Sequence, residues 1–145
     1  MTRHEVVTEV QPRLVIDRVD AAITFYAAVF GATLLERYVD ASEVVVHAAI
    51  QIGSSVISLV EEVTKWQLLA ATSMGGSPVL LHLTLPDPDA ACERAVALGG
   101  TVLIPIADRP YGKREGRLRD PFGHLWILSC PIETLTKEQI RQRLA

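Results

Sequence analysis

The chain repeats one of its own segments at a separation of 69 residues. The run "DAAITFYAAVFGATLL" begins at Asp20, and "DAACERAVALGGTVLI" begins at Asp89 (89 − 20 = 69). The same separation relates Gly31 to Gly100, and both glycines are expected just past the end of a helix. An internal repeat indicates that one supersecondary unit occurs twice. The 145 residues therefore predict one domain built from two similar modules.

Each copy is predicted to form a strand, a helix and then about three strands. Apolar residues at helical spacing in the first copy predict one buried helix face, formed by Ala22, Phe25, Tyr26, Val29 and Phe30. In the second copy Asp87 is a good N-cap and Pro88 suits the first helical position.

Turn residues mark a hairpin in each half. The first turn is expected near Gly53, and the second is the Asp-Pro-Phe-Gly run at 120–123. Thr136 and Gln139 form a capping box that begins a last helix. The predicted parts of the single domain 1–145 are module 1 at about 8–62, a linker at 63–77, module 2 at about 78–131 and a C-terminal helix at about 134–145.

Composition limits the class of partner. The net charge of −3 and the pI near 5.8 argue against a nucleic-acid-binding surface. No apolar run approaches the length of a membrane span, so we expect a soluble, cytoplasmic protein with no membrane partner. The two cysteines, Cys92 and Cys130, have no spacing typical of a zinc site or a disulfide framework.

Strand alternation predicts one face beneath the helix and one half-polar face in each module. The half-polar faces of the two sheets are expected to enclose a common space, which would be the ligand site. His47 and His82 fall on these faces. Each histidine either is satisfied by neighbouring groups or serves as a ligand contact or an acid–base group, and the sequence leaves both interpretations open.

The order and spacing of several motifs resemble the vicinal oxygen chelate superfamily, the group of glyoxalases, bleomycin-resistance proteins and extradiol dioxygenases. The motifs are "FYAAVFGA", "VVHAAIQIG", "PYG" and "RLRDPFGHLW", and they are most similar to the PhnB-like branch. The resemblance implies an α+β fold of two tandem βαβββ modules. These would form a curved mixed-sheet cup with a short C-terminal helix. It also implies a homodimer.

Metal-dependent members of this superfamily bind a divalent ion with four side chains, from the first and last strand of each module. The resemblance places these positions at Gln11, Ser58, Leu80 and Ile127. Only Gln11 offers a useful donor, so we expect no metal and no cofactor. An atypical site formed by Gln11, His47 and His82 is the alternative.

We therefore expect a non-catalytic protein that binds or sequesters an aromatic or amphipathic small molecule. The alternative is a glyoxalase- or dioxygenase-like enzyme (lyase, isomerase or oxidoreductase) without a metal or with an atypical one. No catalytic residue is assigned. Arg117 and Arg119 either hold an anionic substrate or lie at a solvated edge, paired with acids such as Asp120. The predicted ligand-binding residues are Gln11, His47, Ser58, Leu80, His82, Tyr111 and Ile127.

Overall fold

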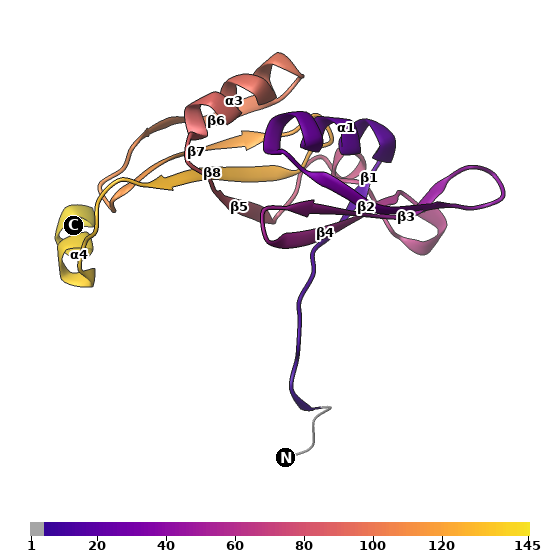
Figure 1. Cartoon of the computed structure of the whole chain (residues 1–145), viewed down its shortest axis with the longest axis horizontal. Helices are drawn as coiled ribbons and strands as arrows, with labels where there is room; N and C mark the ends of the chain where they lie inside the picture. The colour runs from indigo at the N-terminus through magenta and orange to yellow at the C-terminus, as the bar shows by residue number, and fades with distance from the viewer. Residues whose placement is uncertain (1–4) are drawn as a thin grey trace.

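The first module is a four-stranded sheet with one covering helix. The computed structural model describes residues 5–145 (Figure 1). Residues 1–4 of the predicted domain lie outside the described part. The strand order is β1-β4-β3-β2, with β1 parallel to β4 and the other pairs antiparallel. The elements are β1 (Arg13–Ile16), α1 (Val19–Phe30), β2 (Thr33–Val39), β3 (Val45–Ile52) and β4 (Ser55–Glu61).

The second module repeats this topology. Its strand order is β5-β8-β7-β6, and β5 is parallel to β8. A short 3-10 helix (Thr64–Trp66) and α2 (Ala71–Met74) precede it. Its elements are β5 (Leu80–Thr84), α3 (Pro88–Ala97), β6 (Thr101–Asp108), β7 (Lys113–Arg119) and β8 (Leu125–Pro131), followed by α4 (Lys137–Leu144). The predicted α+β fold of two tandem βαβββ modules is confirmed.

The helix ends follow local sequence signals. Gly31 ends α1 in the left-handed conformation, with φ of 70°. The Asp87 side chain accepts a hydrogen bond from the Ala90 backbone, and Pro88 opens α3. The capping box of Thr136 and Gln139 begins α4. These three predictions are confirmed. None of the helices within residues 5–145 is long and apolar enough to cross a membrane.

The predicted role of Gly100 is wrong. Helix α3 ends at Ala97, and it is Gly99, with φ of 102°, that takes the left-handed conformation. Gly100 is required for a different reason. A Cβ atom at Gly100 would lie 2.9 Å from the carbonyl oxygen of Ala95, so the chain passes close to the end of the helix. The repeat aligned the two glycines correctly, but the helices end at different distances from them. Helix α1 ends at Phe30, directly before Gly31, whereas α3 ends at Ala97, three residues before Gly100.

The two modules share one hydrophobic core. Helices α1 and α3 contact each other and lie on the same side of both sheets (Figure 1). The core contains Tyr26 and Leu14 from the first module and Trp126 and Phe122 from the second. In addition, the His124 Nε2 atom lies 3.0 Å from the Val15 carbonyl oxygen. We call the side of each sheet that is turned away from α1 and α3 its open face.

Asp120 connects α1 to the β7–β8 turn. Its carboxylate is 3% exposed and accepts hydrogen bonds from the Tyr26 hydroxyl and, at 2.8 Å, from the Trp126 indole nitrogen. It also accepts bonds from the backbone N–H groups of Phe122 and His124 at 2.8 and 3.0 Å. Burial and then the charge of Asp120 raise the pKa of Tyr26 well above its usual value. The phenol therefore remains a donor at neutral pH.

Gly116 allows β6 and β7 to approach closely at an irregular part of their pairing. A Cβ atom there would lie 2.5 Å from the Ile104 carbonyl oxygen and 2.8 Å from the Ile106 nitrogen. We expect Gly116→Ala to lower the free energy of unfolding by about 1–3 kcal/mol, because backbone rather than a flexible side chain must move. Urea denaturation measures this. Arg117→Ala, on the same strand and exposed, should change stability by about 0.5 kcal/mol or less. Equal stability of the two variants would show that β6 moves freely.

Candidate functional site

The four positions that correspond to metal ligands in the resembling family do not form a metal site. Leu80 and Ile127 have no donor atom. Ser58 is only 3% exposed, and its hydroxyl lies 3.4 Å from the Pro12 carbonyl oxygen, to which it donates. Gln11 is exposed in the extended segment before β1. One amide cannot hold a divalent ion alone, so these residues do not fit a metal.

The remaining potential ligands do not supply an alternative cluster. Within residues 5–145 no group of three or more His, Cys, Asp or Glu side chains lies close enough together to hold a metal ion. In the sheet register Ser58 lies opposite Arg13, and Ile127 lies opposite His82. The place next to Ser58 is therefore occupied by a guanidinium cation, which would repel a divalent ion.

We call the sheet of the first module sheet 1 and that of the second module sheet 2. His47 belongs to a hydrogen-bonded network on the open face of sheet 1. The Arg13 Nη1 atom lies 2.8 Å from His47 Nδ1, and His47 Nε2 lies 2.8 Å from a Glu36 oxygen. Because arginine can only donate, Nδ1 is the acceptor and Nε2 carries the proton. Both ring nitrogens are engaged. His47 is therefore neither a free metal ligand nor a free base in this arrangement.

Glu36 and Tyr38 complete this network. The Tyr38 hydroxyl donates to Glu36 at 3.1 Å, and its ring stacks on the His47 ring at a centroid distance of 6.0 Å. The hydrogen bond from His47 and then that from Tyr38 lower the pKa of Glu36 below its usual value. The carboxylate therefore remains charged at neutral pH and keeps the imidazole in one orientation.

The open face of sheet 2 carries two arginine cations beside apolar side chains. His82, Ile127 and Arg117 form one cross-strand row, and Leu80, Leu125 and Arg119 form the next. Leu118 is buried in the core, so its neighbours Arg117 and Arg119 point to the open face. The alternating pattern of the sequence alone did not show which face of the sheet these two arginines use.

Neither arginine has a hydrogen bond or ion pair with any side chain or backbone group among residues 5–145. The expected pairing with Asp120 does not occur, because that carboxylate is buried and bound to Tyr26 and Trp126. His82 likewise has no hydrogen-bond partner in the described chain. This face therefore presents three polar side chains that no contact within residues 5–145 satisfies.

A hollow of about 520 Å³ lies at the end of this face that is nearest the β7–β8 turn. Its floor is formed by Thr101, Leu103, Arg119 and Leu125, and its wall by α2 residues and the loop at 75–77. Gly75 and Gly76 have φ values of 76° and 152°, which let the loop turn back over the sheet. The volume suits a small molecule, and the hollow combines apolar surface with one guanidinium.

Glu115 organises the other end of the same face. It accepts hydrogen bonds from the Tyr111 hydroxyl and, at 2.7 Å, from the Ser129 hydroxyl. Burial raises the pKa of Glu115, but these two bonds and the nearby His82 together lower it more, so the pKa lies below its usual value. Tyr111 and Arg117 line a smaller hollow of about 170 Å³ beside it. The Tyr111 hydroxyl borders this hollow and is already engaged with Glu115.

We expect Glu115→Gln to lower the free energy of unfolding at pH 7 by about 1 kcal/mol, because hydrogen bonds to a charged acceptor are lost. The pKa of Glu115 in the folded state lies below its usual value of 4.5. The charged carboxylate therefore stabilises the fold at pH values above 4.5, and this contribution is lost as the pH falls through the folded-state pKa. The parent and the variant should therefore converge in stability as the pH falls below the folded-state pKa of Glu115. Urea denaturation at several pH values tests this, and a constant difference at all pH values would contradict it.

The sequence predicted some of these residues and missed others. His82, Leu80, Ile127 and Tyr111 lie on or beside the open face of sheet 2, whereas His47 lies on sheet 1 in its own network. Arg13, Glu36 and Glu115 were not predicted. Glu36 and Tyr38 alternate along one strand opposite His47, and this cross-strand pattern could have indicated the network.

The sequence is similar to that of a known protein family. Residues 7–128 match the family model described as Glyoxalase/Bleomycin resistance protein/Dioxygenase superfamily. The chain belongs to this superfamily. An uncharacterized protein of Mycobacterium bovis is 35% identical over 137 residues, which cover 92% of this chain and 90% of that protein.

Two solved structures show the same superfamily fold. A Bacillus cereus protein described as a putative 3-demethylubiquinone-9 3-methyltransferase, PhnB protein, has a TM-score of 0.68 and 18% identity, covering 85% of this chain and 99% of that one. The fosfomycin resistance protein FosX of Listeria monocytogenes, complexed with Mn(II) and sulfate, has a TM-score of 0.67 and 17% identity. This match covers 97% of the chain and 100% of FosX. At these identities the likeness shows the fold alone.

Proposed function

We propose that this superfamily member binds a small molecule with an apolar body and an anionic group, and that it does so without a metal ion. The observation that carries the proposal is the open face of sheet 2. There Arg117 and Arg119, neither with a side-chain partner among the described residues 5–145, adjoin the apolar side chains of Leu80, Leu125 and Ile127. The four family metal positions meanwhile offer only Gln11 as a useful donor.

The chemistry of the arginines selects the ligand class. A guanidinium group presents a planar set of donors that matches a carboxylate or phosphonate, often with two parallel hydrogen bonds. In the hollow, the Arg119 side chain lies among lining residues that include Leu103 and Leu125. An aromatic or alkyl body would then cover the leucine and isoleucine side chains, and this burial contributes about 25 cal/mol per Å² of apolar surface.

The motif "RLRDPFGHLW" supports placement in the PhnB-like branch as part of this proposal. We propose that the ligand is held and released unchanged, as in a sequestering protein of the bleomycin-resistance type. This function needs only affinity, and the two arginines supply it without an assigned acid, base or metal.

A second candidate function is catalysis, and one observation favours it. The His82 imidazole has no hydrogen-bond partner within the described residues and lies near the charged Glu115. An imidazole in this position could accept a proton from a ligand held by Arg117. In this case His82, rather than the engaged His47, would be the acid–base residue of a metal-independent lyase or isomerase.

Native mass spectrometry distinguishes these candidates. The protein, purified without chelators, is incubated with a panel of aryl carboxylates and arylphosphonates and with their neutral amide counterparts. Binding of one anion per chain, recovered with unchanged mass and unchanged chromatographic retention, supports the binding proposal. Recovery of a product of altered mass, or of an isomer with altered retention, that His82→Ala abolishes supports the enzyme instead. Equal binding of the acids and the amides would contradict the role of the arginines.

We also propose that the protein is a homodimer. Strand β2 is exposed along its whole length, and four of its large apolar side chains, Leu34, Leu35, Tyr38 and Val39, face solvent in one chain. A second copy would cover such an edge. Sedimentation velocity should give the mass of two 15.9 kDa chains. Leu35→Lys should shift the equilibrium toward monomer, and a monomeric parent at all concentrations would contradict the proposal.

A further inference from the structure

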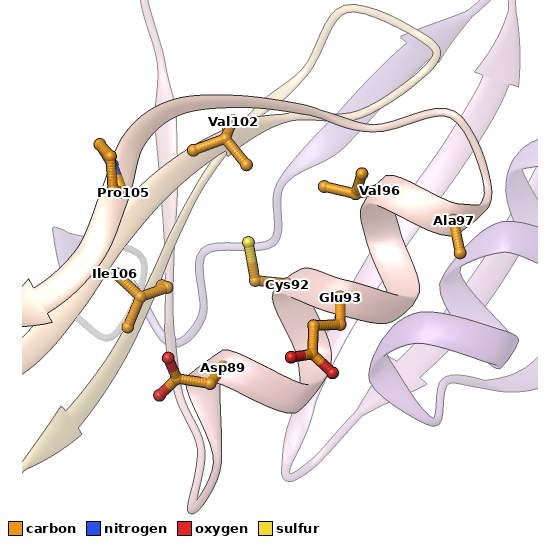
Figure 2. A pocket seen from close by; sticks show the side chains of 8 residues that line it. All are labelled: Asp89, Cys92, Glu93, Val96, Ala97, Val102, Pro105 and Ile106. Atoms are coloured by element: carbon orange, nitrogen blue, oxygen red, sulfur yellow. The ribbon is translucent and has the colours of Figure 1, made fainter.

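A further cavity lies on the other side of sheet 2, between α3 and the edge strand β6. It has a volume of about 520 Å³ and is lined by residues of these two elements only (Figure 2). We call it the α3–β6 groove. Its lining residues are Asp89, Cys92, Glu93, Val96, Ala97, Val102, Pro105 and Ile106. It shares no lining residue with the hollow at Arg119.

The middle of the groove is apolar. The Cys92 sulfur points into the space between the helix and the strand, and Val96, Val102 and Ile106 surround it (Figure 2). Val96 and Val102 remain 48% and 39% exposed, so apolar surface is left uncovered. Burial, followed by the charges of Asp89 and Glu93, raises the pKa of Cys92. The thiol is therefore neutral at pH 7 and contributes as a small apolar group.

One end of the groove is negatively charged. Asp89 and Glu93 lie one turn apart on α3, and Asp108 ends β6 nearby. A single guanidinium, that of Arg114, pairs with Asp89 at 2.8 Å and with Asp108 at 2.9 Å. Glu93 has neither a hydrogen bond nor an ion pair among residues 5–145. Two carboxylates therefore share the Arg114 cation, and the Glu93 carboxylate has no partner within the described part of the chain.

We propose that the α3–β6 groove binds a small amine that carries an aromatic or alkyl body. The body would cover Val96, Val102 and the Cys92 thiol, and the ammonium group would lie beside Glu93. The groove would therefore favour a cationic ligand, whereas the arginines on the open face of sheet 2 favour anions. The groove is therefore a second site with a different ligand class, and it does not depend on the function proposed above.

Alkylation of Cys92 reports occupation of the groove. In a Cys130→Ser background Cys92 is the only cysteine of the chain. N-ethylmaleimide modification is followed by mass spectrometry with 4-phenylbutylamine, 4-phenyl-1-butanol or 4-phenylbutyrate present. We expect the amine to slow modification about tenfold when its concentration is about ten times its Kd, as simple occupancy requires. The alcohol should protect only at higher concentration, and the acid should not protect.

Two variants make this result specific. Glu93→Gln should weaken protection by the amine about threefold, the size expected for one exposed ion pair, and leave protection by the alcohol unchanged. Val96→Arg, at a half-exposed position, should abolish protection by the amine because it brings a cation into the groove. Equal protection by all three compounds, or no protection by the amine, would overturn the proposal. A Cys92 that becomes reactive only on dilution would show that a second copy covers the groove, which would also overturn it.

Discussion

Replacement of Asp120 by alanine is expected to lower the free energy of unfolding by about 3–5 kcal/mol. The substitution removes the acceptor of four hydrogen bonds at a position that is 3% exposed. It leaves the Tyr26 hydroxyl and the Trp126 indole N–H buried without a partner, and such groups are costly. Urea denaturation followed by tryptophan fluorescence measures the effect.

Two further variants show whether the effect comes from these bonds. Asp120→Asn keeps the shape and one oxygen acceptor, so it should cost about 1–3 kcal/mol, less than the alanine variant. Asp108→Ala removes an aspartate that forms an exposed ion pair with Arg114, and it should cost about 1 kcal/mol or less. If Asp120→Ala cost no more than Asp108→Ala, Asp120 would not connect α1 to the β7–β8 turn as described.

The second large effect is on binding. The double variant Arg117→Ala/Arg119→Ala is expected to weaken binding of an aryl carboxylate by about 10- to 100-fold, since charge-assisted hydrogen bonds contribute about 1.5–3 kcal/mol. Both side chains are exposed and lie outside the core, so the fold should be unaffected. Isothermal titration calorimetry gives the two dissociation constants.

A matched variant separates charge from geometry. Arg117→Lys/Arg119→Lys keeps both charges but removes the planar pair of donors, so we expect an intermediate affinity. Binding of the neutral amide should change little in either variant. Equal affinities of the parent and the double alanine variant for the acid would exclude the arginines as the anion site.

The repeat predicted most of the fold. A separation of 69 residues identified two equivalent modules, and local caps at Asp87 and Thr136 identified where two helices begin. These features depend on short stretches of chain, which the sequence shows directly. The predicted role of Gly100 was wrong because α3 ends at Ala97 and the adjacent Gly99, which the sequence also shows, takes the left-handed conformation with φ of 102°.

The site was less predictable. Alternation placed His82, Leu80 and Ile127 on one face, and the structure agrees. The sequence could not show that Arg13 engages His47, because these residues are 34 positions apart. It also could not show that Asp120 is unavailable to Arg119, because burial of its carboxylate depends on Tyr26 in the other module. Long-range partners of polar side chains decide which groups remain free to bind a ligand.

In the function proposed here, the open face of sheet 2 binds an anionic small molecule without a metal ion. Calorimetric titration of the highest-affinity aryl carboxylate or phosphonate of the panel, with and without EDTA, tests this directly. We expect the same dissociation constant in both conditions. Loss of binding in EDTA that added Mn²⁺ or Zn²⁺ restores, or failure of every anion in the panel to bind, would contradict it.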